Sequence, residues 1–208
     1  MFDKIKELII EGEEDDIEAA VQEEIDGGAD PNDIIAAMTA TMDIIGEQFT
    51  NGEIFVPEML VSAETMQNGM NLLKPLLKGD SASALGKVAI GTVEGDLHDI
   101  GKNLVAMMYE SAGFDVVDLG VDVSADKFVA AIKADPDIKV IGMSALLTTT
   151  LGNMRETIKA IKAAGLHEGR FIMIGGAPTS AAFAEEIGAD AYTPDAASAA
   201  AKAKELVA

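Results

Sequence analysis

The stretch VAIGTVEGDLHDIGKN, residues 88–103, decides the fold of this 208-residue chain. It opens with five largely apolar residues, 88–92, whose number and composition predict a buried β-strand. A polar, Gly-containing turn with one histidine, His98, follows, and a helix-like segment begins after Gly101. A strand, a loop and a helix in this order form the repeating unit of a parallel α/β sheet.

The same alternation continues toward the C-terminus. We expect further strands at residues 115–119, 140–144 and 171–174 and a short one near Ala191, each followed by a helix-like segment. Their continuously apolar character is typical of parallel strands that are covered on both faces. With right-handed crossovers, this pattern predicts a flavodoxin-like (Rossmann-like), doubly wound α/β fold with a five-stranded parallel sheet. Ligands in such sheets bind beyond the carboxyl ends of the strands.

The N-terminal part has helical periodicity instead. Apolar residues recur there at three and four positions, and Asp30 followed by Pro31 matches a helix cap with a first-turn proline. Val56 followed by Pro57 begins another helix in the same way. Together with helices expected at residues 2–10 and 16–25, this makes an N-terminal four-helix bundle.

The two patterns meet in a segment rich in Gly, Ser and Ala, residues 77–86. Such composition marks a linker. We therefore expect a helical domain at residues 1–80, a linker at 81–86 and the α/β domain at 87–208.

Composition excludes several classes of protein. The 36 acidic and 15 basic residues give a formal charge of -21, which repels nucleic acid and anionic membrane surfaces. No cysteine is present, so disulfides, thiolate zinc sites and iron–sulfur clusters are excluded. The sequence contains no apolar run of the length that a signal peptide or a membrane span needs, and we expect a cytoplasmic protein.

The loop after the first strand carries the chemistry. Asp96 and His98 are two residues apart, and a carboxylate that binds one imidazole nitrogen raises the basicity of the other toward a metal. An alternative is that His98 is a surface residue that caps the following helix. Ser144-Ala145-Leu146 ends the third strand and Gly175-Gly176 ends the fourth, so all three loops fall on one edge of the sheet.

In this order, Asp-x-His-x-x-Gly, Ser-x-Leu and Gly-Gly resemble the cobalamin-binding signature of the methyltransferase corrinoid protein family. This family includes the cobalamin module of methionine synthase and the small corrinoid proteins of methanol, methylamine and glycine betaine methyltransferase systems. The stretches that carry the resemblance are GDLHDIGKN (95–103), VVDLGVDVSADK (116–127), IGMSALLTTT (141–150) and IGGAPTS (174–180).

The resemblance implies roles for individual residues. His98 would be the ligand of the cobalt, Asp96 its hydrogen-bond partner, and Thr150 the hydroxyl that completes a relay, where methionine synthase has serine. The residues that the resemblance places around the cobalamin are Gly95, Asp96, Leu97, His98, Asp99, Gly101, Ser144, Leu146, Thr148, Gly175, Gly176, Ala196, Phe49 and Val56.

Phe49 and Val56 lie in FTNGEIFVP, residues 49–57, which is similar to the family's helical cap over the methyl-bearing face of the corrin. The helical domain would then be a cap domain. Both residues also suit the core of a helical bundle, the commoner place for such side chains. His167, the second histidine, lies in a polar turn and is interpreted as a solvated surface residue.

The function implied by the resemblance is that of a methyl carrier with cobalamin (methylcobalamin) as cofactor. Its cobalt would cycle between Co(I) and methyl-Co(III), and the carrier itself would be a non-catalytic component. Its partners would be a substrate:corrinoid methyltransferase, a second methyltransferase acting on tetrahydrofolate or a thiol, and a reductive activase. Three alternatives remain open: the small subunit of an adenosylcobalamin-dependent mutase, a cobalamin-based sensor, and a flavodoxin-like receiver domain without a corrinoid.

Overall fold

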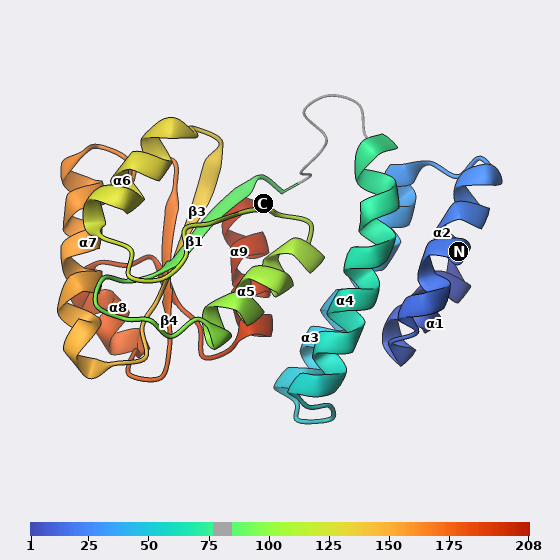
Figure 1. The fold of residues 1–208 in the computed structure, drawn as a ribbon, viewed down its shortest axis with the longest axis horizontal. Helices are drawn as coiled ribbons and strands as arrows, with labels where there is room; N and C mark the ends of the chain where they lie inside the picture. Colours follow the sequence, from blue (N-terminus) through green and yellow to red (C-terminus); the bar gives the residue numbers. More distant parts are fainter. Residues whose placement is uncertain (77–84) are drawn as a thin grey trace. The chain divides into compact units, whose positions relative to one another are not determined.

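A computed structural model describes residues 1–76 and 85–208 (Figure 1). Residues 81–84 of the predicted linker therefore lie outside the described residues. The chain divides into two compact units, a helical unit in the N-terminal part and an α/β unit that begins at Leu85. None of the helices in the described ranges combines the length and the apolar character that a membrane span requires.

The helical unit contains the four predicted helices. These are α1 (Asp3–Glu11), α2 (Glu14–Asp26), α3 (Pro31–Thr50) and α4 (Val56–Leu73), followed by a single 3-10 turn, η1 (Lys74–Leu76). The Asp30 side chain caps α3 by accepting a hydrogen bond from the Asn32 amide at 2.9 Å. At the start of α4 the Phe55 amide donates to Glu58 Oε2 at 2.7 Å, the acidic half of a capping box.

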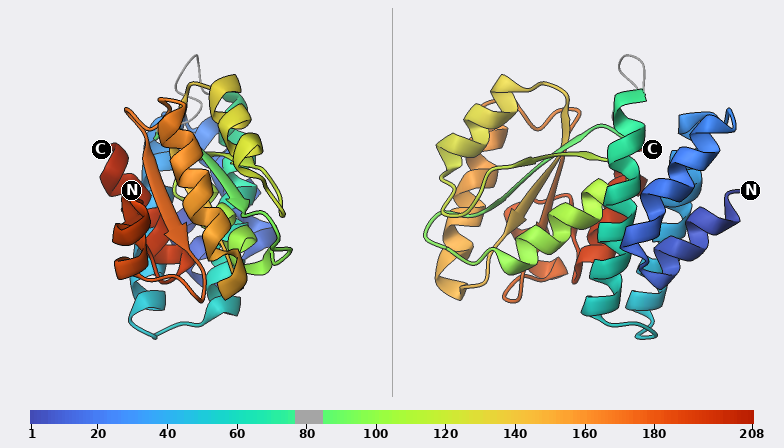
Figure 2. Two further views of the ribbon diagram at one scale, coloured as in Figure 1. Left: turned by 90° about the vertical axis from the view of Figure 1, so that its left-hand side faces the viewer. Right: turned by 45° about the vertical axis from the view of Figure 1, so that its right-hand side comes forward.

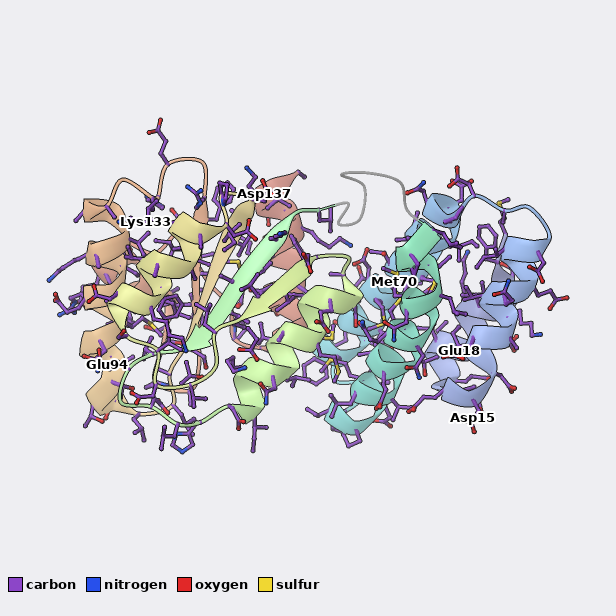
Figure 3. The ribbon with its side chains drawn as sticks, turned by 45° about the horizontal axis from the view of Figure 1, so that its top comes forward. Asp15, Glu18, Met70, Glu94, Lys133 and Asp137 are labelled. Atoms are coloured by element: carbon purple, nitrogen blue, oxygen red, sulfur yellow. The ribbon has the colours of Figure 1, made fainter. Side chains whose placement is uncertain are left out.

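Isoleucine and methionine side chains fill the core of the helical unit. Met70 lies inside it, whereas Asp15 and Glu18 on α2 point outward (Figure 3). Ile17 and Met38 are fully buried, as the three-and-four spacing predicts. Flexible methionines fill the irregular spaces between short helices, a role for which their unbranched side chains are well suited.

The α/β unit is built on a parallel sheet with the strand order β2-β1-β3-β4-β5. Its strands are β1 (Lys87–Thr92), β2 (Asp115–Asp118), β3 (Ile138–Ser144), β4 (Phe171–Gly175) and β5 (Ala191–Tyr192). The helices are α5 (Ile100–Ser111), α6 (Ala125–Ala134), α7 (Leu151–Ala163), α8 (Ala181–Ile187) and α9 (Ala196–Val207), and the 3-10 turn η3 (Thr148–Thr150) precedes α7.

Helices cover both faces of this sheet (Figure 2). On one face α6, α7 and α8 bury Phe128, Ile158 and Ile187 against the strands. α5 and α9 lie on the other face, where Tyr109 of α5 is buried and its hydroxyl donates to Met173 Sδ of β4 at 3.9 Å. Burial on both faces explains why the strands are apolar along their whole length.

The predicted fold class is confirmed: four N-terminal helices precede a doubly wound, five-stranded parallel sheet. β1 and β3 are neighbours, and their crossovers run to opposite faces, since α5 and α7 lie on different sides of the sheet. This is the topological switch point at which ligands bind in such folds. The loops that follow β1 and β3 therefore define the place to look for a site.

Candidate functional site

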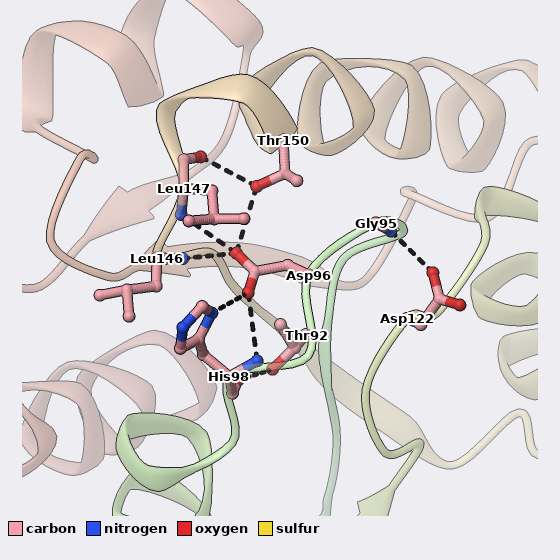
Figure 4. A network of polar contacts seen from close by, with 8 residues as sticks. All are labelled: Thr92, Gly95, Asp96, His98, Asp122, Leu146, Leu147 and Thr150. Carbon is pink, nitrogen blue, oxygen red and sulfur yellow. Dashed lines mark hydrogen bonds and ion pairs between the residues drawn. The ribbon is translucent and has the colours of Figure 1, made fainter.

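The centre of the site is the carboxylate of Asp96, in the loop that follows β1 (Figure 4). Asp96 is fully buried and accepts five hydrogen bonds. Oδ1 accepts from the His98 amide at 3.1 Å and pairs with His98 Nδ1 at 2.7 Å. Oδ2 accepts from the amides of Leu146 and Leu147 at 2.7 and 3.1 Å and from Thr150 Oγ1 at 3.2 Å. One side chain thus joins the loop after β1 to the loop after β3.

These contacts determine the charge of Asp96. Burial by itself would raise the pKa of the carboxyl, but the hydrogen bonds from the Leu146 amide, the His98 ring and amide, and the Leu147 amide hold that pKa below its ordinary value. The carboxylate is therefore ionised at neutral pH despite its burial. It also lies at the N-terminal end of η3 and α7, where a negative charge is favoured.

An ionised Asp96 fixes the tautomer of His98. A carboxylate only accepts, so the 2.7 Å contact requires a proton on Nδ1, and in the neutral imidazole Nε2 then carries the free lone pair. The His98 side chain is 52% exposed, and no described residue hydrogen-bonds its Nε2. An accessible Nε2 on an imidazole whose Nδ1 is bonded to a carboxylate is the arrangement found in metal-ligating histidines.

His98 is suited to a metal that brings its other ligands with it. In residues 1–76 and 85–208 no group of three or more His, Asp or Glu side chains could hold an ion by itself. The loops around His98 instead expose large aliphatic side chains: Leu97 is 70%, Ile100 85% and Leu146 46% exposed. Exposed apolar side chains next to a ligating nitrogen suit the apolar face of a macrocycle better than a hydrated ion.

Gly176, which follows β4, has a structural explanation within the protein. Its φ of +116° lies in the left-handed region, and a Cβ built at this position would lie 1.9 Å from the carbonyl oxygen of Ala145. The backbones of the β3 and β4 loops therefore pack directly against each other here. At Gly175, a Cβ would make only ordinary contact with the Thr193 carbonyl at 3.5 Å.

The remaining predicted residues of the α/β unit lie at the same edge of the sheet. Ser144 ends β3, Thr148 begins η3, and Ala196 is the buried first residue of α9 after β5. Asp99 and Gly101 flank the start of α5 and are exposed, and the space around Gly101 is open. The structure thus brings the predicted loops together around His98, while their contacts with a corrinoid remain a prediction.

Phe49 and Val56 belong to the helical unit. Phe49 is half-buried near the end of α3, and Val56 is the first residue of α4 and is 40% exposed. Between them along the chain, Phe55 is the most exposed aromatic residue of the helical unit, although the sequence pattern did not single it out.

The second histidine, His167, lies at the opposite edge of the sheet from His98. His167 lies in a surface turn with its side chain 32% exposed, and its Nε2 is in addition 2.8 Å from Asp190 Oδ2, a contact that was not predicted. Asp190 Oδ2 also accepts from the Ile172 amide at 2.7 Å, so this pair anchors the amino end of β4. His167 is therefore held at the edge of the sheet opposite to His98.

The contact between Leu147 and the Asp96 carboxylate was not predicted from the sequence. Leu147 acts through its backbone amide, which any residue type except proline would provide. The sequence after β3, ALLTTT at residues 145–150, does not specify which N–H points to the carboxylate.

Comparison with known proteins shows the family of the chain. Two family models, each described as a B12 binding domain, match residues 86–202 and residues 1–74. Dimethylamine corrinoid protein 1 of Methanosarcina acetivorans is 42% identical over 100% of this chain and 98% of its own length.

Two solved structures are similar over nearly the whole chain. A cobalamin-binding protein from Desulfitobacterium hafniense has a TM-score of 0.84 and 33% identity, covering 100% of this chain and 99% of that one. A chain of the methanol:cobalamin methyltransferase complex from Methanosarcina barkeri has a TM-score of 0.80 and 32% identity, covering 98% of this chain and 78% of that one. The chain belongs to the B12-binding methyltransferase corrinoid proteins, and its cofactor is a cobalamin.

Proposed function

We propose that this protein carries a methyl group from a substrate:corrinoid methyltransferase to a second methyltransferase that acts on tetrahydrofolate or a thiol. The observation that supports this proposal is the accessible Nε2 of His98, held by the buried, ionised Asp96 at the switch point of the sheet. The cofactor supplies a cobalt that accepts and releases methyl groups, and the protein binds, orients and presents it. The corrinoid proteins among its relatives favour a carrier over a mutase subunit or a sensor.

In this proposal His98 would hold the cobalt through Nε2, and Asp96 would keep a proton on Nδ1. Because hydrogen bonds hold the pKa of Asp96 below its ordinary value, the group that faces Nδ1 at 2.7 Å is a carboxylate, which only accepts. Asp96 therefore acts as a fixed counter-charge, and Thr150 contributes a third donor to its Oδ2 at 3.2 Å.

We assign residues 1–80 to a cap domain, 81–86 to a linker and 87–208 to the cobalamin-binding domain. Phe49 and Val56 would cover the methyl-bearing face of the corrin, as an apolar cap that must move before a partner enzyme can reach the cobalt. A Phe49→Ala variant should then lose the bound methyl group faster on illumination or oxidation. Equal photolysis and oxidation rates in wild type and variant would remove the cap role from Phe49.

The methyl donor is a methylated amine or alcohol in this proposal. The dimethylamine corrinoid protein and the methanol:cobalamin methyltransferase complex among the similar proteins support this chemical class. A reductive activase would return oxidised cobalt to the Co(I) state. Methylation of the cobalamin-loaded protein by a methylamine or methanol methyltransferase, followed by transfer to tetrahydrofolate or a thiol, tests the whole cycle.

The axial ligand is tested separately from the cycle. Full-length protein is reconstituted with cobalamin, desalted, and its absorption spectrum compared with those of His98→Ala and His167→Ala. We expect imidazole ligation in wild type and His167→Ala, and its loss in His98→Ala, because only His98 has a free Nε2 at the carboxyl edge of the sheet. A protein that retains no corrinoid would refute the function, and identical spectra for the two variants would refute the ligand.

A further inference from the structure

Asp122, in the loop between β2 and α6, has a backbone conformation that its residue type does not favour. Its φ is +51°, and within residues 1–76 and 85–208 only one other non-glycine residue, Phe2 near the N-terminus, has a positive φ. The left-handed conformation is unfavourable for a residue with a Cβ, and it persists where surrounding contacts hold it in place. The contacts of Asp122 therefore need an explanation.

Those contacts are made with the loop that carries His98. Asp122 Oδ1 accepts a hydrogen bond from the Gly95 amide at 2.7 Å (Figure 4). The Asp122 amide donates to the Asp96 carbonyl at 3.0 Å. The two bonds hold consecutive residues from a segment 27 positions away in the sequence. An Asp that served only its own turn would bond to its own neighbouring backbone, as aspartates commonly do in turns. Here the carboxylate reaches another loop.

The other backbone groups of the loop are held as well. Thr92 Oγ1 donates to the His98 carbonyl at 2.9 Å, and Asn153 Nδ2 on α7 donates to the Glu94 carbonyl at 2.7 Å. Gly95 itself is left-handed, with φ +81°, and a Cβ there would lie 3.5 Å from Thr150 Cγ2. The loop is thus fixed by β1, by α7 and by Asp122, from three different directions.

We propose that Asp122 is a positioning residue for cobalt ligation: its two hydrogen bonds to Gly95 and Asp96 hold the His98 loop in its ligating conformation before cobalamin binds. This inference rests on the proposed function, in which His98 is the axial ligand. Holding a ligand's supporting backbone in place removes the cost of ordering it on binding. The unfavourable φ of Asp122 is consistent with this role, since glycine would fit the backbone but could not bond the Gly95 amide.

The test uses full-length, cobalamin-loaded protein and follows His98 ligation by absorbance during acid titration. Asp122→Ala loses the acceptor for the Gly95 amide, and we expect the ligation constant to fall about 3- to 10-fold, the usual effect of one hydrogen bond. Loss of ligation would then shift upward by about half to one pH unit. Asp122→Asn keeps a side-chain oxygen and tolerates a left-handed backbone, so it should restore ligation to near the wild-type constant.

Two further variants separate positioning from effects on folding and on charge. Asp122→Gly removes the acceptor but also the backbone strain, so its Tm should stay near that of wild type while ligation weakens as in Asp122→Ala. Asp126→Ala removes a carboxylate from the exposed first turn of the neighbouring α6, and it should leave the ligation midpoint unchanged.

The outcomes divide clearly. Wild-type midpoints in both Asp122→Ala and Asp122→Gly would overturn the inference, and so would equal shifts in all variants including Asp126→Ala, because net charge would then be the cause. A His98→Ala protein measured alongside separates an error in the axial ligand from an error in the role of Asp122. If its spectrum equals that of wild type, the proposed axial ligand is wrong; if it differs while the Asp122 variants match wild type, only the role of Asp122 is lost.

Discussion

Replacing Asp96 by asparagine is the most informative single change in this protein. The substitution preserves the size of a fully buried side chain but removes its charge and turns one oxygen into an NH2 group. Five donors surround the two carboxylate oxygens, three at Oδ2 and two at Oδ1. An asparagine has only one side-chain oxygen, so either the two donors at Oδ1 or the three donors at Oδ2 must face its NH2 group.

The less costly orientation keeps the oxygen on the Leu146, Leu147 and Thr150 side, where three donors converge. The NH2 group then faces the His98 amide and Nδ1. The amide loses its acceptor, and the ring can avoid a clash only by moving its proton from Nδ1 to Nε2, which removes the lone pair that binds metal. The variant therefore damages both stability and ligation, through one carboxylate oxygen.

The magnitudes follow from these contacts. A buried donor left without a partner costs about 1 to 3 kcal/mol, and the lost charge-assisted bonds add to this, so we expect unfolding free energy to fall by roughly 2 to 4 kcal/mol. This corresponds to a drop in Tm of roughly 5 to 15 °C. The affinity of the cobalt for His98 should fall about 10- to 100-fold, as for other losses of a histidine's carboxylate partner.

Thermal unfolding of the cobalamin-free protein and absorption spectra of the loaded protein measure the two effects. Thr150→Val is the matched control, because it keeps the shape of the side chain and removes only the hydroxyl, which lies 3.2 Å from Asp96 Oδ2 and 2.9 Å from the Leu147 carbonyl. It should lower stability by about 1 kcal/mol and alter the spectrum little. An Asp96→Asn protein with wild-type Tm and spectrum, or one less affected than Thr150→Val, would refute the reasoning.

Three further predictions concern the stability of the protein, and the last of them also concerns cofactor retention. The pKa of Asp96 lies below its ordinary value of 3.8, so its stabilising effect is complete above about pH 5 and is lost as pH falls through lower values; Tm should decrease on acidification, and a flat profile would contradict this. Gly176→Ala would force a Cβ against the Ala145 carbonyl, and unfolding should be easier by about 3 kcal/mol or more, or the protein should fail to accumulate. Gly101→Ala, at an open position in α5, should raise stability by up to about 1 kcal/mol by calorimetry and weaken cobalamin retention only where the cofactor occupies that space.

The sequence was sufficient to predict the elements because their signals are local. Asp30 with Pro31 marks the start of α3, and the apolar run of β1 predicts a buried strand within one residue of its observed bounds. Asp96 and His98 could be paired for the same reason, because residues two apart in a tight loop meet whatever the rest of the chain does.

The other contacts of the site could not be predicted, because they depend on backbone geometry and not on residue type. The amide of Leu147 and the left-handed backbone of Asp122 act through geometry set by distant strands. The contact of His167 with Asp190 could not be predicted for a related reason, since the two residues are 23 positions apart in the sequence. Exposure also cannot be read from composition: Phe49 and Phe55 are the same residue type, and only the folded helices show that Phe55 is the more exposed.

The bond between Asp96 and the Leu146 amide spans 50 residues of chain. Between these two residues lie α5, β2, α6 and β3, and this segment must fold before the hydrogen bond can form. Contacts of such long range form late, because the entropy of loop closure has to be overcome first. During synthesis, His98 and Asp96 leave the ribosome well before Leu146 and Leu147, whose amides bind the Asp96 carboxylate. The conformation of His98 that suits metal binding therefore depends on the completed central sheet.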